Sequence, residues 1–410
     1  MILIVFAFLL ISAINCQNNL DSELDSVFVK HNMMGMSVAT LCNGKISYVY
    51  NNGLKDFERN LVFDNNTMFR IASISKFVTT TGLMMLYDEG LFELNRDISL
   101  DIGFTVRNPH WPGVPITYQM LVSHTSGLRD GSKYDAFLAD TVNSLGDPPS
   151  IKEILVPGGA YYTEDIWDSN LPGNYFTYCN LNFGVVGTLI EALSGERFDI
   201  YMRERLLQKM GIGGSYNVRD IEFIDDVAAT YRNENGWVAQ NDNYEGVPPE
   251  PLNMTGYVPG TNGAQFSPIG GLRISTLDLV KIMQLHLSKG VWEGIQLLSE
   301  QSVELMQEDV WQNNGLNGDT EGGLYQAWGL SVHHTTNTMG DVVFPDRRMF
   351  GHLGNAYGLI SDFYFDPQSD YGVIFVTNGV FNGLSIGEET AFYQVEEDVF
   401  RAVFDNNSCP

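Results

Sequence analysis

MFRIASISKFVTTTGLMMLY, residues 68–87, joins a short β-type segment to an apolar segment with helical spacing. The pattern predicts a strand end over Met68 to Ile71 and a helix over Ser75 to Tyr87, with apolar residues at three- and four-residue steps. Ser73 would then lie at a helix N-terminus, where free backbone N–H groups and the helix dipole favour negative charge. Lys76 would lie one turn later on the same face, within reach of the Ser73 hydroxyl.

An S-x-x-K pair of this kind can act as a nucleophile with its proton acceptor. The amine must be neutral when it takes the proton, so burial or a nearby cation must lower its pKa from about 10.4. The structural alternative is that Ser73 is a helix cap and Lys76 a surface residue, since the pattern occurs by chance about once in a chain this long. The pair therefore needs support from other motifs.

The second motif is Tyr178-Cys179-Asn180, directly before a predicted helix over Leu181 to Leu193. A tyrosinate or polarised phenol at Tyr178 could relay the serine proton, and the Asn180 amide could orient Lys76 and the acyl group. The alternative is an aromatic residue packed at a helix start with an Asn cap, and Y-x-N also occurs at residues 50–52 and 231–233.

The third motif is His352-Leu353-Gly354, between two segments with strand character. We expect the His352 head to point into the site, and Gly354 to let the strand backbone approach the substrate. The Asn355 N–H could then face the N–H of Ser73 and complete a two-donor oxyanion hole. The alternative is an ordinary packed or solvated histidine.

Segments with strand character bracket a mostly helical middle. Strands are predicted over 36–41 and 45–50, joined by the Asn43-Gly44 turn signal, and over 326–333, 349–352, 359–365 and 371–377. Helices are predicted over 20–30, 117–123, 198–210, 276–287 and 386–404, besides those given above. We therefore expect an α+β fold, with one antiparallel sheet formed by the N- and C-terminal segments, flanked by helices, and a mainly helical insertion.

The first sixteen residues have the layout of a secretory signal peptide, with an apolar run from Ile2 to Ile11 before small residues. The run is shorter than the roughly 20 residues that cross a membrane, so no stable membrane insertion is expected. We expect a signal peptide over 1–16 and a single domain over 17–410. Its sheet parts would span about 17–99 and 260–404, and its helical part about 100–259.

The expected location is outside the cell, or the lumen of the secretory or lysosomal pathway. Removal of the signal leaves Cys42, Cys179 and Cys409, whose pairing is not readable from the sequence. N-glycosylation acceptor patterns begin at Asn65, Asn253 and Asn406. The formal charge of −27, from 50 acidic and 23 basic residues, would repel phosphate backbones, so no nucleic-acid partner is expected.

The three motifs occur in the order S-x-x-K, Y-x-N and H-x-G, and with them the chain resembles the serine β-lactamase and penicillin-binding superfamily. The resemblance is to the branch of class C β-lactamases, D-alanyl-D-alanine carboxypeptidases, D-aminopeptidases and related esterases. ITYQMLVSHTSGL at 116–128 and PIGGLRIST at 268–276 are also similar to that branch. The likeness covers about residues 24–376.

The resemblance implies a β-lactamase/transpeptidase-like fold in which Ser73 is the acylated nucleophile, Lys76 its proton partner and Tyr178 the general base and acid. It further implies acyl transfer to water from a small-molecule ester, amide or peptide substrate, with the site between the sheet and the helical part. No metal or organic cofactor is implied, because the scattered histidines lack metal-ligand spacing and the chemistry needs none. The oligomeric state is left open.

The substrate-binding residues implied are Asn180, His352, Gly354 and Asn355. Many β-lactamases carry Lys-Thr-Gly at the third motif, and His352 would be a weaker, pH-dependent cation there. This favours an esterase, amidase or D-amino-acid peptidase. A true β-lactamase is the first alternative, and a non-catalytic binding or assembly protein that keeps the fold is the alternative from another class.

Overall fold

The computed structural model describes residues 19–338, 340–381, 384–406 and 409. The predicted signal peptide over residues 1–16 lies outside the described residues. Within them, no helix combines the length and the apolar character that a membrane crossing requires.

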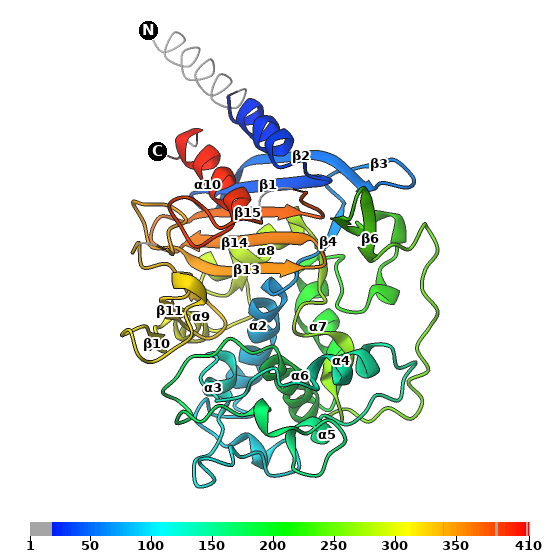
Figure 1. Cartoon of the computed structure of the whole chain (residues 1–410), viewed down its shortest axis with the longest axis vertical. Helices are drawn as coiled ribbons and strands as arrows, with labels where there is room; N and C mark the ends of the chain where they lie inside the picture. Colours follow the sequence, from blue (N-terminus) through cyan, green and yellow to red (C-terminus); the bar gives the residue numbers. More distant parts are fainter. Residues whose placement is uncertain (1–18, 339, 382–383, 407–408, 410) are drawn as a thin grey trace.

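A nine-stranded antiparallel sheet is built from both ends of the described chain, in the order β10-β11-β12-β13-β14-β15-β1-β2-β3. Its strands are β1 Gly35–Cys42, β2 Lys45–Asp56, β3 Leu61–Val62, β10 Trp311–Gln312, β11 Ala327–Trp328, β12 His333–His334, β13 Phe350–Ala356, β14 Leu359–Asp366 and β15 Tyr371–Thr377. The N- and C-terminal parts join where β1 pairs with β15, from Met36–Thr377 to Leu41–Gly372 (Figure 1). The predicted α+β fold is confirmed.

Helices cover both faces of the sheet, so β14 and β15 are buried along their whole length. The helix over residues 19–30 and α10 (Gln394–Asn406) lie on one face, where Leu24 and Val399 share an apolar cluster with the sheet. Helices α2 (Ile74–Asp88) and α8 (Thr276–Leu287) lie on the other (Figure 1). Phe77 of α2 packs against Phe363 of β14, so the sheet positions α2 and with it Ser73.

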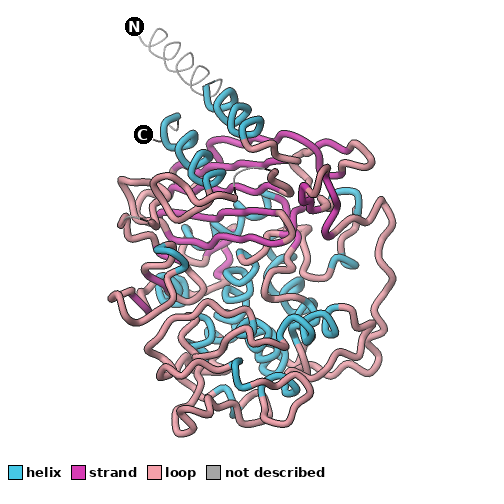
Figure 2. Tube along the Cα trace, viewed as in Figure 1, coloured by secondary structure: helices cyan, strands magenta, loops and turns pink. Residues whose placement is uncertain are grey.

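The remaining helices are α3 Tyr118–Val122, α4 Tyr134–Val142, α5 Lys152–Leu155, α6 Leu181–Ser194, α7 Phe198–Met202 and α9 Glu300–Gln307. Loops separate them over much of the chain between residues 100 and 259 (Figure 2). Short strand pairs lie outside the main sheet: β4 Met68–Arg70 with β7 Arg273–Ser275, β5 Thr230–Asn233 with β6 Trp237–Asn241, and β8 Val291–Trp292 with β9 Ile295–Gln296. The β5–β6 hairpin in the expected helical part was not predicted.

Several predicted element bounds are wrong. The strand predicted over 326–333 is two short strands, because the Gly329 N–H bonds the Val332 carbonyl and the chain reverses. Strand β13 continues past 352 to Ala356, because it pairs with β14 as far as Leu359. The last helix begins at Gln394 instead of 386. Helix α7 ends at Met202, and the chain continues to 210 as π and 3₁₀ turns.

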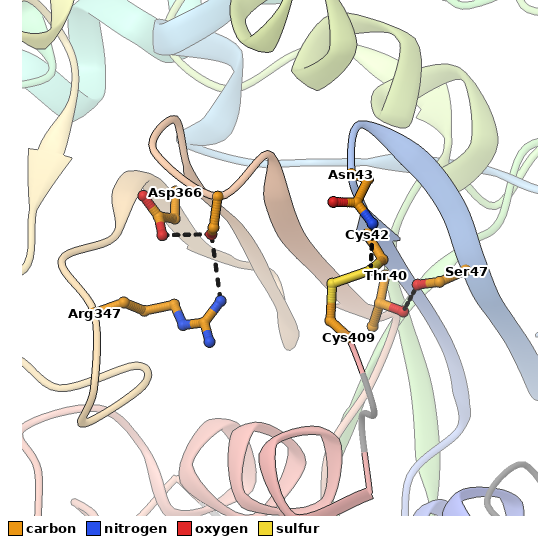
Figure 3. Close-up of a disulfide and its surroundings, with 8 residues drawn as sticks. Thr40, Cys42, Asn43, Ser47, Arg347, Asp366 and Cys409 are labelled. Carbon is orange, nitrogen blue, oxygen red and sulfur yellow. Dashed lines mark hydrogen bonds between the residues drawn. A yellow bond between two sulfur atoms is a disulfide. The ribbon is translucent and has the colours of Figure 1, made fainter. Parts of the chain in front are cut away.

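A disulfide joins Cys42, the last residue of β1, to Cys409, three residues beyond the end of α10 (Figure 3). Cys179 is free and buried. The pairing that the sequence left open thus ties the two ends of the described chain together. Of the glycosylation patterns, Asn65 and Asn253 are exposed, whereas Asn406 is buried.

Candidate active site

Ser73 lies on a sharp turn between strand β4 and helix α2. Ala72 before it has a φ of 44°, in the left-handed region that residues other than glycine seldom adopt. The Ser361 hydroxyl of β14 donates to the Ile71 carbonyl at 3.0 Å and ties this turn to the sheet. Ser73 occupies the N-cap position of α2, but its side chain makes no capping bond. The hydroxyl is therefore not used as a helix cap.

Lys76 is fully buried, and the predicted reach to the serine is present. Its Nζ lies 2.9 Å from Ser73 Oγ and donates at 2.9 Å to the carbonyl of Ile269, within the 268–276 stretch. Burial lowers the pKa of Lys76 to about 7, because the protonated amine is poorly solvated. The alternative of a surface lysine is wrong, and much of the amine is neutral near pH 7.

Tyr178 is held between two rings beside this pair. His124 stacks on it with ring centroids 4.3 Å apart, and Tyr325 stacks at 5.6 Å. Lys76 Nζ lies 5.1 Å from the centre of the Tyr178 ring. Burial raises the pKa of Tyr178, while interaction with the Ser73 side chain acts in the opposite direction. Tyr178 is thus a phenol at neutral pH, not a tyrosinate.

Asn180 occupies the N-cap position of α6 without a side-chain capping bond, and its amide is held by a residue that sequence reasoning missed. Its Nδ2 donates to Asp130 Oδ2 at 2.8 Å. No hydrogen bond between Asn180 and Lys76 is found among the described residues, and the role of Asn180 in orienting Lys76 and the acyl group stays a prediction. The motif nevertheless stands beside Lys76, because Tyr178 and Asn180 share one turn at the α6 N-terminus.

His352 is fully buried with its ring beside Tyr178, and burial keeps it neutral, so the cation expected at this position is absent near neutral pH. Its Nδ1 lies 2.6 Å from the Leu353 carbonyl and donates to it. Burial, with Lys76 as a nearby positive group, lowers the pKa of His352 to about 3. Its ring packs edge-on to Trp328 at 5.3 Å and to Tyr178 at 6.2 Å. Desolvation therefore decides its charge, and its part in substrate binding stays a prediction.

Gly354 brings the edge of β13 against the start of α2. A Cβ atom at this position would lie 2.7 Å from the Ile71 carbonyl oxygen and 2.5 Å from Ser361 Oγ. The glycine is therefore needed for close packing of β13 against Ile71 and Ser361, and the predicted approach of its backbone to the substrate stays a prediction. Asn355 is exposed on the same strand and donates from Nδ2 to the Tyr393 hydroxyl at 3.0 Å. Its part in an oxyanion hole stays a prediction.

His124 forms hydrogen bonds with the residues directly before and directly after Tyr178. Its carbonyl accepts the Thr177 N–H at 2.9 Å, and its Nδ1 accepts the Cys179 N–H at 3.1 Å. Burial lowers the pKa of His124, which keeps the ring neutral and Nδ1 free to accept. His124 lies in the 116–128 stretch, so its signal was present in the sequence, although no role was assigned to it.

Strand β11 and the loop before it supply two further aromatic residues that were missed. Tyr325 stacks on Tyr178, and Trp328 packs edge-on to it at 6.0 Å. Neither residue belongs to a motif that would have pointed to the site. Both lie about 150 positions from Tyr178 along the chain, so their contact with it could not be predicted from the sequence. Among the residues that the structure describes, no three His, Cys, Asp or Glu side chains gather closely enough to hold a metal ion.

Comparisons with known proteins find similar proteins that agree with one another in family. The family model described as Beta-lactamase matches residues 18–391. Penicillin-binding protein 4 of Amycolatopsis lactamdurans is 23% identical over 387 residues, which is 92% of this chain and 87% of that protein.

Two solved structures share the fold. The octameric penicillin-binding protein homologue from Pyrococcus abyssi has a TM-score of 0.68 and 22% identity, over 88% of this chain and 73% of that chain. The D-amino acid amidase from Ochrobactrum anthropi SV3, complexed with D-phenylalanine, has a TM-score of 0.66 and 20% identity, over 96% of this chain and 100% of that chain.

Proposed function

Because the chain belongs to the beta-lactamase family, as the three motifs predicted, we propose that it is a serine hydrolase that forms an acyl-enzyme on Ser73. The observation that carries the proposal is the 2.9 Å contact between Ser73 Oγ and the Nζ of the buried Lys76. Buried amines are costly unless they lose their charge, and a neutral amine beside a hydroxyl is a base.

In the acylation step, Ser73 Oγ attacks the substrate carbonyl carbon and its proton passes to the neutral Lys76 Nζ. The phenol of Tyr178 lies beside both groups and passes a proton to the leaving oxygen or nitrogen as that bond breaks. The positive end of α2 stabilises the negative charge that develops on the carbonyl oxygen.

Deacylation uses the same groups in reverse. A water molecule attacks the acyl carbon and gives its proton to the Tyr178 oxygen, which lost its own proton to the leaving group during acylation. The protonated Lys76 returns its proton to Ser73 Oγ as the acyl bond breaks, so that all three groups regain their starting states. In every proton step the protein group that gives or takes the proton is Ser73, Lys76 or Tyr178.

The substrates that we propose are esters, amides or peptides, in line with the predicted esterase, amidase or D-amino-acid peptidase. The neutral state of His352 supports this choice over a true β-lactamase, because the third motif then offers no charge to a substrate carboxylate. The fold shared with a D-amino acid amidase places amides of D-amino acids among the first to test.

We place the reaction outside the cell or in the lumen of the secretory or lysosomal pathway. The Cys42–Cys409 disulfide supports this location, because such bonds persist mainly in oxidising compartments.

The test is a screen of p-nitrophenyl esters, D-amino-acid amides and β-lactams, with fluorophosphonate labelling in parallel and Ser73→Ala as the control. We expect turnover of at least one ester or amide, and label on the peptide that contains Ser73. Faster turnover of a β-lactam than of any ester would instead make the protein a true β-lactamase. A folded wild-type protein that takes no label and turns nothing over would be a binding or assembly protein.

A further inference from the structure

Asp130 lies between α3 and α4 and binds the segment that carries Tyr178 and Asn180. Its Oδ2 accepts the Asn180 backbone N–H at 3.1 Å and the Asn180 Nδ2 at 2.8 Å. Its Oδ1 accepts the Leu181 N–H at 2.8 Å and the Cys179 thiol at 3.5 Å. One carboxylate therefore holds three consecutive residues directly after Tyr178.

The direction of these bonds sets the orientation of the Asn180 side chain. An ionised carboxylate only accepts hydrogen bonds, so the amide must turn its Nδ2 toward Asp130. The carboxylate also lies at the positive end of α6, a helix of 14 residues, where negative charge is stabilised. Asp130 is itself exposed, so its replacement leaves no buried cavity.

The charge of Asp130 also reaches the reacting groups. It raises the pKa of Lys76, against the larger effect of burial. Cys179 acts on Lys76 in the same direction, but burial raises the pKa of that thiol and keeps it uncharged. The other titratable groups that face Lys76 are His124 and His352, which burial keeps neutral, and the phenol of Tyr178.

We propose that Asp130 is a positioning residue for the hydrolysis: it holds the segment from Tyr178 to Leu181 beside Ser73 and fixes the orientation of the Asn180 amide. The proposal rests on the proposed function, and Asp130 acts through its neighbours without contact to the reacting atoms. If Asp130 positions the segment, its replacement should lower the rate of hydrolysis. Removal of its negative charge should have a separate effect on the pH profile of the rate.

The experiment compares wild type with Asp130→Asn, Asp130→Glu and, as a matched control, Asp135→Asn. Asp135 is an exposed carboxylate five residues away, in the first turn of α4. The measurements are kcat/KM for the best substrate of the screen, and the rate of fluorophosphonate labelling, from about pH 5 to about pH 9. Circular dichroism and the melting temperature report folding.

Asp130→Asn should lower the high-pH plateau of kcat/KM roughly tenfold, because charge-assisted bonds to Asn180 and Leu181 are lost. It should also move the acid limb of the pH profile to lower pH by about half a unit. Lys76 loses a neighbouring negative charge, and the effect is small because solvent partly screens that charge. Asp130→Glu keeps the charge but displaces the carboxylate, so the plateau should fall while the acid limb stays. Asp135→Asn should change neither.

If the Asp130→Asn variant has the same kcat/KM plateau and the same acid limb as the wild type, the positioning role is overturned and the proposed function stays intact. If Asp130→Asn does not fold, Asp130→Glu decides: a lowered plateau with an unmoved acid limb supports the proposal, and a wild-type plateau overturns it. A wild-type protein without label or turnover would overturn the proposed function, and the role of Asp130 with it.

Discussion

A buried pair of carboxyl groups should make the stability of the protein strongly dependent on pH. Asp362 of β14 and Glu396 of α10 have 0% and 1% of their surfaces exposed. Burial raises the pKa of Glu396 to about 8, and burial together with Glu396 raises that of Asp362. The Tyr393 N–H donates to Glu396 Oε2 at 2.6 Å, and the nearby Tyr325 and Tyr364 are phenols whose pKa values are raised.

Stability falls as the pH rises, because the folded protein binds more protons at this pair than the unfolded chain does. The contribution of Glu396 is fully present below its ordinary pKa of 4.5 and is lost as the pH rises through about 8. At about 1.4 kcal/mol for each pH unit, the loss between about pH 5 and about pH 8 is on the order of 4 kcal/mol for Glu396. For a chain of this length, that corresponds to a fall in melting temperature of roughly 5 °C.

Glu396→Gln removes the titrating group and keeps its volume, so its melting temperature should depend less on pH than that of the wild type. The assay is scanning calorimetry at one scan rate, at about pH 5 and about pH 8. Glu388→Gln, an exposed position in the same part of the chain, is the matched control and should follow the wild type. Equal falls in melting temperature for Glu396→Gln and the wild type would refute the reasoning.

Three further outcomes test the site and the fold. Wild-type kcat/KM should rise with pH through about 7, because Lys76 must be neutral to take the serine proton. Lys76→Met should lower kcat/KM roughly a thousandfold. A flat wild-type pH profile below pH 7 would contradict this role of Lys76. Gly354→Ala should lower kcat/KM and cost about 2 kcal/mol in denaturant unfolding, because the new methyl group meets the Ile71 carbonyl; wild-type values would show that the strand edge yields freely. The double variant Cys42→Ser, Cys409→Ser should lose about 3 kcal/mol of stability, because the bridge spans 367 residues, and an unchanged melting temperature in calorimetry would count against it.

Local patterns in the sequence were enough for the main elements and for the nucleophile. Apolar spacing predicted α8 with the bounds that the structure has, and the Asn43-Gly44 turn predicted the β1–β2 hairpin. The reach of Lys76 to Ser73 was predictable because residues three apart on a helix lie on one face. Each of these follows from the geometry of a few neighbouring residues.

Packing between distant segments decided the charges at the site. Sequence reasoning expected a cation at His352, but the fold buries its ring against Trp328 and keeps it neutral. It required a neutral Lys76 without showing how the amine would be desolvated, and complete burial of the side chain in the folded protein supplies the reason. Desolvation depends on the atoms that surround a group in space, which the order of residues along the chain does not reveal.

The sequence by itself determined the family, the fold class and the order of the three motifs. The tertiary structure alone decided that Asp130 holds Asn180, that Tyr325 covers Tyr178 and that Cys42 pairs with Cys409. The physical reason is that helix and strand preferences act over a few residues, whereas these contacts join segments 50 to 367 positions apart and form only when folding brings those segments together.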